Sequence, residues 1–294
     1  MQEDILKSLK PDIIVEILEM AVAFENWKKV METADILYQC VQRIYEERQY
    51  HKAMKLSIPH VHLERPLVYY FGLSHLMCGM AHQNQGTYEQ ARECIYKYAE
   101  LGWMEDLKEE DIQVVEEFRF LAKTNLYAVD ILSGNIELIE EYVAFLQDNL
   151  EEILPGLNTI LQAALMYHLD VGDILHTFAE QIDEFGSYED AENVSYYYSY
   201  CYHLALYYRK CGRLQDAVGL TLRAMQLADQ SGNDGQFKKC TALFESLRES
   251  STAEQISEYR QILMQSLDDY ETGRHFIVKR KMNDPLWSEQ GIGS

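Results

Sequence analysis

The sequence has 294 residues, of which 47 % are hydrophobic and 25 % charged, so it holds enough apolar surface for a folded core and is not typical of a disordered chain. Its formal net charge of -22 excludes a chain that grips DNA or RNA through its own surface, because phosphates would be repelled. The acidic surface is either a solubility device or a weak preference for a basic partner, and the sequence leaves both interpretations open.

Signals for secretion, membrane insertion and disulfide formation are missing from the sequence. No apolar stretch reaches the roughly 18 to 20 residues that a membrane span needs. Met1 is followed by Gln2, Glu3 and Asp4 rather than by a basic and then apolar segment. The six cysteines lack a CxxC pair or another short metal-binding spacing, which favours reduced core thiols. We therefore predict a cytoplasmic protein with no membrane partner.

The first expected elements are two paired helices. The chain has only 5 prolines and 15 glycines, and apolar residues recur three or four positions apart, a pattern that predicts helices rather than a many-stranded sheet. The pattern places one helix at residues 11–24 and a second from 27 to about 48, which Asn26 opens.

The next helices, expected at residues 67–83 and 88–101, show a repeat. In tetratricopeptide repeats two helices cross at a small residue, turn at a glycine and carry an alanine early in the second helix. Two segments of this chain match that pattern at the same internal spacings, the first through Gly79, Gly86, Tyr88 and Ala91, and the second through Ala205, Tyr208, Gly212, Leu214, Ala217 and Ala224.

Weaker units complete the array. Gly134 supplies the turn of a third copy, in which Ile139 stands where the alanine is expected. Further pairs are expected at 156–169 with 172–185 and at 236–249 with 252–267. The fold class predicted is all-α, a right-handed superhelical array of tetratricopeptide-like hairpins over residues 1–270, with divergent helices at 12–48 and a partly disordered tail at 271–294.

Catalytic and metal-binding motifs are scarce. The sequence has no nucleophile elbow, P-loop, dinucleotide fingerprint or HExxH motif, so we do not expect an enzyme. His60 and His62 are one residue apart and would chelate weakly, but neither has a neighbouring cysteine or a partner one helical turn away. We expect neither a metal nor a cofactor.

A concave binding face is expected on the first helix of each repeat. In a right-handed array of such hairpins these helices line the inner wall, where they meet an extended ligand. Counting from the matched small residues selects the peptide-binding candidates Met80 and Asn84 in the first clear repeat, Asn125 in the second, and Tyr202, His203 and Arg209 in the third.

Two of these candidates have a specific chemical rationale. Asn125 would donate to a peptide carbonyl and accept from a peptide amide at once, holding an extended backbone whatever its side chains; the alternative is a solvated or intrahelical asparagine. Arg209 would pair with a ligand carboxylate, or else with surface acids nearby. The tyrosine-rich run at 196–208 mainly indicates packing between helices, although so many rings predict that one or two face a groove.

Beyond the generic repeat, the layout resembles the peptide-pheromone receptors of Gram-positive bacteria, the RNPP group that includes the Rgg, PlcR, NprR and Rap types. The resemblance rests on the divergent helix pair at 11–48, the repeat at 79–102, Asn125 within TNLYAVDILSG, and the repeat at 196–228. It covers nearly the whole chain as an architecture. The same repeats also occur in scaffolds and chaperone adaptors.

The resemblance implies a cytoplasmic, homodimeric receptor that captures a short signalling peptide, with Asn125 as the position carried over first. Transcriptional members place a helix-turn-helix domain before the array, and MQEDILKSLKPD is too short for one. DNA is therefore expected only through a domain absent from this chain, or else the protein does not bind DNA. The leading hypothesis is the ligand-sensing domain of a quorum-sensing type transcription regulator, switched by a peptide-induced change of the array or dimer.

Two alternatives stay open. A response-regulator phosphatase of the Rap type would use an N-terminal bundle, here residues 11–48, with Gln39 or Gln42 exposed. A passive tetratricopeptide scaffold would bind a helix or tail of another protein.

Overall fold

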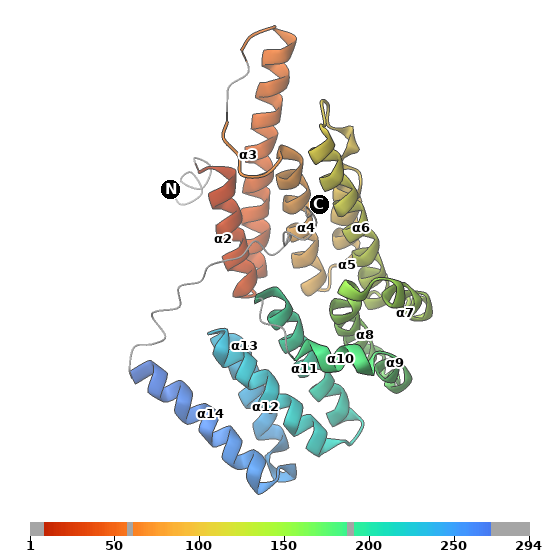
Figure 1. Cartoon of the computed structure of the whole chain (residues 1–294), viewed down its shortest axis with the longest axis vertical. Helices are drawn as coiled ribbons and strands as arrows, with labels where there is room; N and C mark the ends of the chain where they lie inside the picture. The colour runs from red at the N-terminus through yellow and green to blue at the C-terminus, as the bar shows by residue number, and fades with distance from the viewer. Residues whose placement is uncertain (1–8, 58–60, 187–190, 272–294) are drawn as a thin grey trace, which may run out of the picture. The chain divides into compact units, whose positions relative to one another are not determined.

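The computed structural model describes residues 9–57, 61–186 and 191–271, and every regular element in these ranges is a helix (Figure 1). The predicted all-α class is therefore confirmed. The chain divides into two compact units, Met1–Leu138 and Ile139–Ser294, which are described in turn. His60 and the tail from residue 272 onward lie outside the described residues.

Unit 1 is a row of neighbouring helices. Its elements are α2 (Pro11–Ala23), α3 (Trp27–Ala53), α4 (Leu67–Asn84), α5 (Tyr88–Ala99), η1 (Leu101–Trp103), α6 (Glu109–Leu132) and η2 (Ile136–Leu138). Each long helix packs against the next one, and α4 also packs against α6 (Figure 1). The helix predicted to end near residue 48 continues to Ala53, and Asn26 caps its start by accepting a hydrogen bond from Lys29 N at 3.2 Å.

The turns between hairpin helices depend on glycine at the predicted positions. Gly86, Gly134 and Gly212 have φ values of +72°, +115° and +76°, a region in which a Cβ is strongly disfavoured. Gly86 closes the turn between α4 and α5, and Gly134 follows α6. The prediction that these glycines form the turns is confirmed.

Two glycines of α4 bring it close to its neighbours. A Cβ built on Gly79 would lie 3.3 Å from the Cβ of Cys94 on α5, which is the close approach that the repeat pattern predicts. A Cβ on Gly72 would overlap the ring of Phe118 on α6. These contacts on two sides make α4 the buried centre of unit 1.

Unit 2 contains the remaining helices. They are α7 (Ile139–Asp148), η3 (Leu150–Glu152), α8 (Ile153–Tyr167), α9 (Gly172–Thr177), α10 (Ala179–Phe185), α11 (Ala191–Lys210), α12 (Leu214–Gln230), α13 (Asp234–Leu247), η4 (Arg248–Ser250) and α14 (Ala253–Glu271). Helix α8 packs against α7, α10 and α11, and α12 packs against α11, α13 and α14. The helix predicted at 172–185 is interrupted at Phe178, whose φ of -105° and ψ of 17° leave the helical region.

The corner between α8 and α9 is held from a distant helix. His168 ends α8 in the left-handed region with φ 58° and ψ 41°. The buried hydroxyl of Tyr207, on α11, then accepts a hydrogen bond from Val171 N at 3.1 Å and donates one to Asp170 Oδ1 at 2.9 Å. This corner therefore takes its shape from a side chain of another helix.

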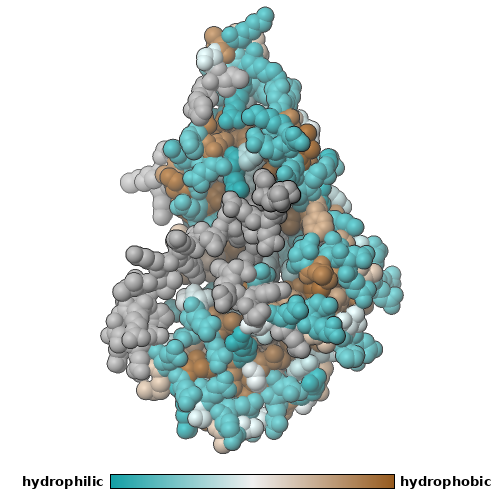
Figure 2. All heavy atoms as spheres, viewed as in Figure 1, coloured by the Kyte–Doolittle hydropathy of each residue, from teal (hydrophilic) through white to brown (hydrophobic). Residues whose placement is uncertain are grey.

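On the face shown in Figure 2, hydrophilic side chains cover most of the described surface and hydrophobic residues are exposed in separate patches. This distribution agrees with the high content of acidic residues in the sequence.

Candidate functional site

Asn125 has the best defined surroundings of the six predicted binding residues. It lies half-buried on α6, and its Nδ2 donates a hydrogen bond to the hydroxyl of Tyr98 on α5 at 2.9 Å. The Tyr98 ring is buried and packs against Phe118, with ring centroids 6.0 Å apart. Burial raises the pKa of Tyr98, so the phenol keeps its proton. A buried, neutral hydroxyl therefore fixes the orientation of the Asn125 amide.

The remaining hydrogen-bonding capacity of Asn125 is large. An amide side chain has two donor hydrogens and a carbonyl oxygen with two lone pairs. Tyr98 takes one hydrogen, and no described residue hydrogen-bonds to Oδ1. Asn125 is also not among the buried polar atoms that lack a partner, so its oxygen reaches solvent. This leaves the acceptor oxygen and one donor hydrogen of Asn125 without a partner among the described residues.

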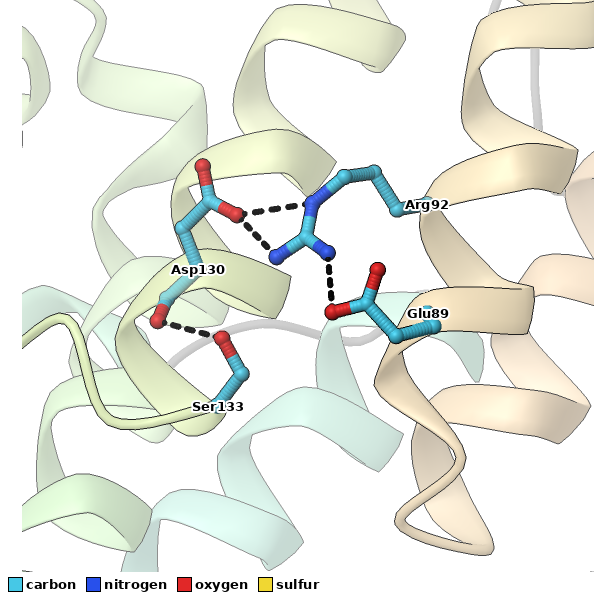
Figure 3. A network of polar contacts seen from close by, with 4 residues as sticks. All are labelled: Glu89, Arg92, Asp130 and Ser133. Carbon is cyan, nitrogen blue, oxygen red and sulfur yellow. Dashed lines mark hydrogen bonds and ion pairs between the residues drawn. The ribbon is translucent and has the colours of Figure 1, made fainter.

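A charged network joins α5 to α6 one turn beyond Asn125 (Figure 3). Arg92 donates from Nε at 3.0 Å and from Nη2 at 2.5 Å to Asp130 Oδ1, and from Nη1 at 2.7 Å to Glu89. Ser133 Oγ donates to the main-chain oxygen of Asp130 at 2.9 Å. The hydrogen bonds that Arg92 donates to Glu89 and Asp130 raise the pKa of Arg92. Because this network is directional, it fixes the register of α5 against α6 and so supports the Tyr98 and Asn125 pair.

The two α4 candidates are less available to a ligand. Asn84 is exposed, but its Nδ2 donates to Met80 O at 2.9 Å, one turn back in the same helix. Met80 is half-buried beside it. The amide of Asn84 thus adopts an intrahelical arrangement, which is the kind of arrangement weighed as the alternative for Asn125.

In unit 2, His203 has a defined tautomer. Asn158 on α8 donates through Nδ2 to Leu154 O at 3.2 Å and to Tyr196 O at 3.0 Å. Its Oδ1 lies 3.2 Å from His203 Nδ1 and can only accept, so Nδ1 carries the proton. Tyr202 is half-buried, with its ring nearly parallel to that of Tyr198 at 6.1 Å.

Arg209 is exposed near the end of α11 and forms no ion pair with a described residue. Its neighbour Lys210 instead donates to Leu165 O at 2.5 Å. Most of the tyrosine run is packing, as the sequence indicates, because Tyr198, Tyr200 and Tyr207 are buried.

The two glutamines considered for a phosphatase bond to acids on their own helix. Gln39 Nε2 donates to Asp35 at 2.6 Å, and Gln42 Nε2 donates to Glu46 at 2.9 Å. Both amides therefore have partners within α3.

A cluster that the sequence analysis missed lies between α4 and α5. The sulfur atoms of Cys78 and Cys94 and a ring nitrogen of His82 all lie within 4.8 Å of one another. The proximity of the two thiols lowers the pKa of Cys78 and raises that of Cys94. Cys78 and His82 are four residues apart on one helix, and this spacing is visible in the sequence. The position of Cys94 opposite them is not, so the sequence analysis did not connect the three residues.

Comparison with known proteins gives no assignment: no family model, no curated protein and no solved structure matches the chain. Among the described residues, no helix combines the length and the apolar character needed to cross a bilayer.

Proposed function

We propose that this chain is a peptide-binding receptor domain, built as a right-handed superhelical array of tetratricopeptide-like hairpins, and that Asn125 holds the main chain of the peptide. The observation that carries this proposal is the hydrogen bond from Asn125 to the buried hydroxyl of Tyr98, 2.9 Å long. It sets the amide in one orientation before any ligand arrives, which lowers the entropy cost of binding.

The chemistry of the site suits an extended peptide. Oδ1 of Asn125 would accept from a peptide N–H, and the second hydrogen on Nδ2 would donate to a peptide carbonyl. Such recognition is independent of the ligand's side chains, so neighbouring residues must supply selectivity. In a chain of net charge -22, a peptide with basic residues is favoured.

The packing of the helices supports the repeat interpretation. In unit 1 each helix contacts its successor, and α4 and α6, the first helices of successive hairpins, contact one another. Glycine allows the close approach at the crossing and the turn of the first clear repeat. In the setting that the family resemblance suggests, the domain would belong to a cytoplasmic, homodimeric quorum-sensing type regulator, and peptide would favour one of two arrangements of the array or dimer.

The test is a titration of the purified chain with a library of peptides of about five to ten residues, followed by thermal shift and calorimetry. A ligand that binds only the folded state raises the apparent melting temperature. Asn125→Ala should abolish binding of a hit. Asn135→Ala is the matched control, since Asn135 is exposed in the turn after α6 and should leave binding unchanged.

Loss of binding in both variants would contradict the role of Asn125. A well-folded chain that binds no peptide would overturn the proposal itself.

A scaffold that binds a partner helix is the second candidate, and α2 favours it. Ile13 and Met20 are exposed at 41 % and 49 % and lie seven residues apart on one face of α2, and Phe24, exposed at 68 %, follows directly at the end of the helix. Exposed apolar stripes of this kind mark protein interfaces. Phe24→Glu would then abolish capture of a partner and leave peptide binding intact.

A further inference from the structure

Three potential metal ligands converge on one side of the α4–α5 hairpin. Cys78 and His82 are four residues apart on α4, so their side chains project from the same face one turn apart. Cys94 approaches from α5, at the point where Gly79 leaves room for it. The packing of the hairpin itself therefore brings the three side chains within 4.8 Å.

A ring nitrogen of His82 lies within the cluster, and a hydrogen bond fixes which of its two nitrogens carries the proton. Thr87 Oγ1 donates its only hydrogen to His82 O at 3.0 Å, so it must accept in its second contact, with His82 Nδ1 at 2.9 Å. The proton of the neutral ring is then on Nδ1, and Nε2 is unprotonated. A hydroxyl or carbonyl partner on the non-ligating nitrogen is the usual support of a metal-binding histidine.

We propose that Cys78, His82 and Cys94 bind a Zn²⁺ ion that links α4 to α5. Thiolate and imidazole donors suit a borderline-soft cation without a strong preference for octahedral geometry. Zinc bonds of about 2.3 Å to sulfur and about 2.0 Å to nitrogen require ligand atoms about 3.5 to 3.8 Å apart in a tetrahedron. The observed limit of 4.8 Å on the separations is about 1 Å longer, so binding would draw the three side chains closer together. Three protein ligands leave a fourth position, which water would take.

The charges around the cluster are compatible with a divalent cation. Two thiolates and a neutral imidazole give a neutral complex with Zn²⁺, and binding releases the two thiol protons to solvent. The charged side chains that act on the two thiols are Lys97 and Glu93 on α5 and Asp35 on α3, so one cation stands against two acids. The bound ion would connect α4 to α5 at the crossing point of the two helices.

The first experiment titrates the reduced, metal-free full chain with Co²⁺, which reports thiolate ligands by charge-transfer absorption and tetrahedral geometry by its visible bands. We expect saturation at one ion per chain and displacement by Zn²⁺. Cys78→Ser and Cys94→Ser should abolish the thiolate absorption. Cys201→Ser, a buried cysteine of unit 2, is the matched control and should leave it unchanged.

Two further measurements test the proposal if a cysteine variant fails to fold: a variant that alters the support of His82, and protection of the cysteines from alkylation in the unaltered protein. Thr87→Val removes the partner of Nδ1 but no ligand, and should weaken Zn²⁺ binding about 10- to 100-fold. In the unaltered protein, Zn²⁺ should protect Cys78 and Cys94 from alkylation and leave the exposed Cys211 reactive. The proposal is overturned if folded, reduced protein shows no thiolate absorption with Co²⁺, or if Zn²⁺ leaves the alkylation of both cysteines unchanged.

Discussion

The ring of Phe118 on α6 occupies the space next to Gly72 on α4 that any other side chain would need. Tyr69 and Tyr98 contact the same ring, with centroid separations of 6.3 Å and 6.0 Å. Phe118 therefore locks α4, α5 and α6 together, and its position depends on the missing Cβ of Gly72.

Gly72→Ala should destabilise the protein by about 1 to 3 kcal/mol, because the ring must leave its rotamer or the helices must separate. This cost exceeds the roughly 1 kcal/mol that alanine gains over glycine within a helix. Urea unfolding measures it. Gly79→Ala is the comparison: its new Cβ would meet Cys94 at 3.3 Å, and its stability should stay within about 1 kcal/mol of the unaltered protein. A smaller loss for Gly72→Ala than for Gly79→Ala would contradict this packing.

Tyr98→Phe should lower both the stability of the protein and its affinity for peptide, although Tyr98 acts only through Asn125 and does not contact the ligand. Removing the hydroxyl keeps the ring contacts with Phe118 but deletes the hydrogen bond to Asn125, at a cost of about 0.5 to 1.5 kcal/mol in unfolding free energy. Peptide affinity should fall as well, because the Asn125 amide loses its fixed orientation. Calorimetry of the variant with a peptide hit checks this, and unchanged affinity would remove Tyr98 from the site.

The ion pair of Arg92 and Asp130 should contribute more than an exposed pair. Their side chains are 21 % and 31 % exposed, and two guanidinium nitrogens contact one carboxylate oxygen. A double-mutant cycle with Arg92→Ala and Asp130→Ala should give a coupling of about 1 kcal/mol. The same cycle on Lys28 and Glu32, which are 84 % and 49 % exposed and 4.0 Å apart, should give close to zero. Equal coupling energies in the two cycles would show that burial does not strengthen the ion pair of Arg92 and Asp130.

Glu152 should make stability decrease as pH rises. Desolvation, and then Glu151, raise its pKa from 4.5 to about 7. Between these values the folded state binds the proton more tightly than the unfolded state, so the stability it confers is present below 4.5 and is lost as pH rises through about 7. Discounted for partial exposure, the effect is about 1 to 2 kcal/mol.

The measurement is urea unfolding of the protein and of Glu152→Gln from about pH 5 to about pH 8. The variant stays neutral throughout, so it should lack this component of the pH dependence and be the more stable form at the alkaline end. Parallel curves for the two proteins would exclude a raised pKa at Glu152.

The helices and their turns were predictable because they depend on local signals. The spacing of apolar residues and the turn glycines Gly86 and Gly212 placed the hairpins, and Gly79 was correctly read as a crossing point. The break at Phe178 was not foreseen, since neither proline nor glycine stands there. Gly72 was missed because its role depends on Phe118, which is distant in sequence.

The site was less predictable than the fold for the same reason. Asn125 was selected by counting along a helix, but nothing in its neighbourhood pointed to Tyr98, 27 residues earlier. Cys78 and His82 have the helical spacing of two ligands, but the third ligand, Cys94, is brought to them only by the α4–α5 packing. Which side chains meet across two helices depends on the tertiary structure and not on the local sequence.

The corner between α8 and α9 has a consequence for how the chain is made. Val171 N and Asp170 receive their hydrogen-bonding partner from Tyr207, 36 and 37 residues later. During synthesis these groups leave the ribosome before α11 does, so water must satisfy them until the later helix arrives. Formation of this corner is therefore tied to the arrival of α11 rather than to its own local sequence, which makes it a late step in vectorial folding.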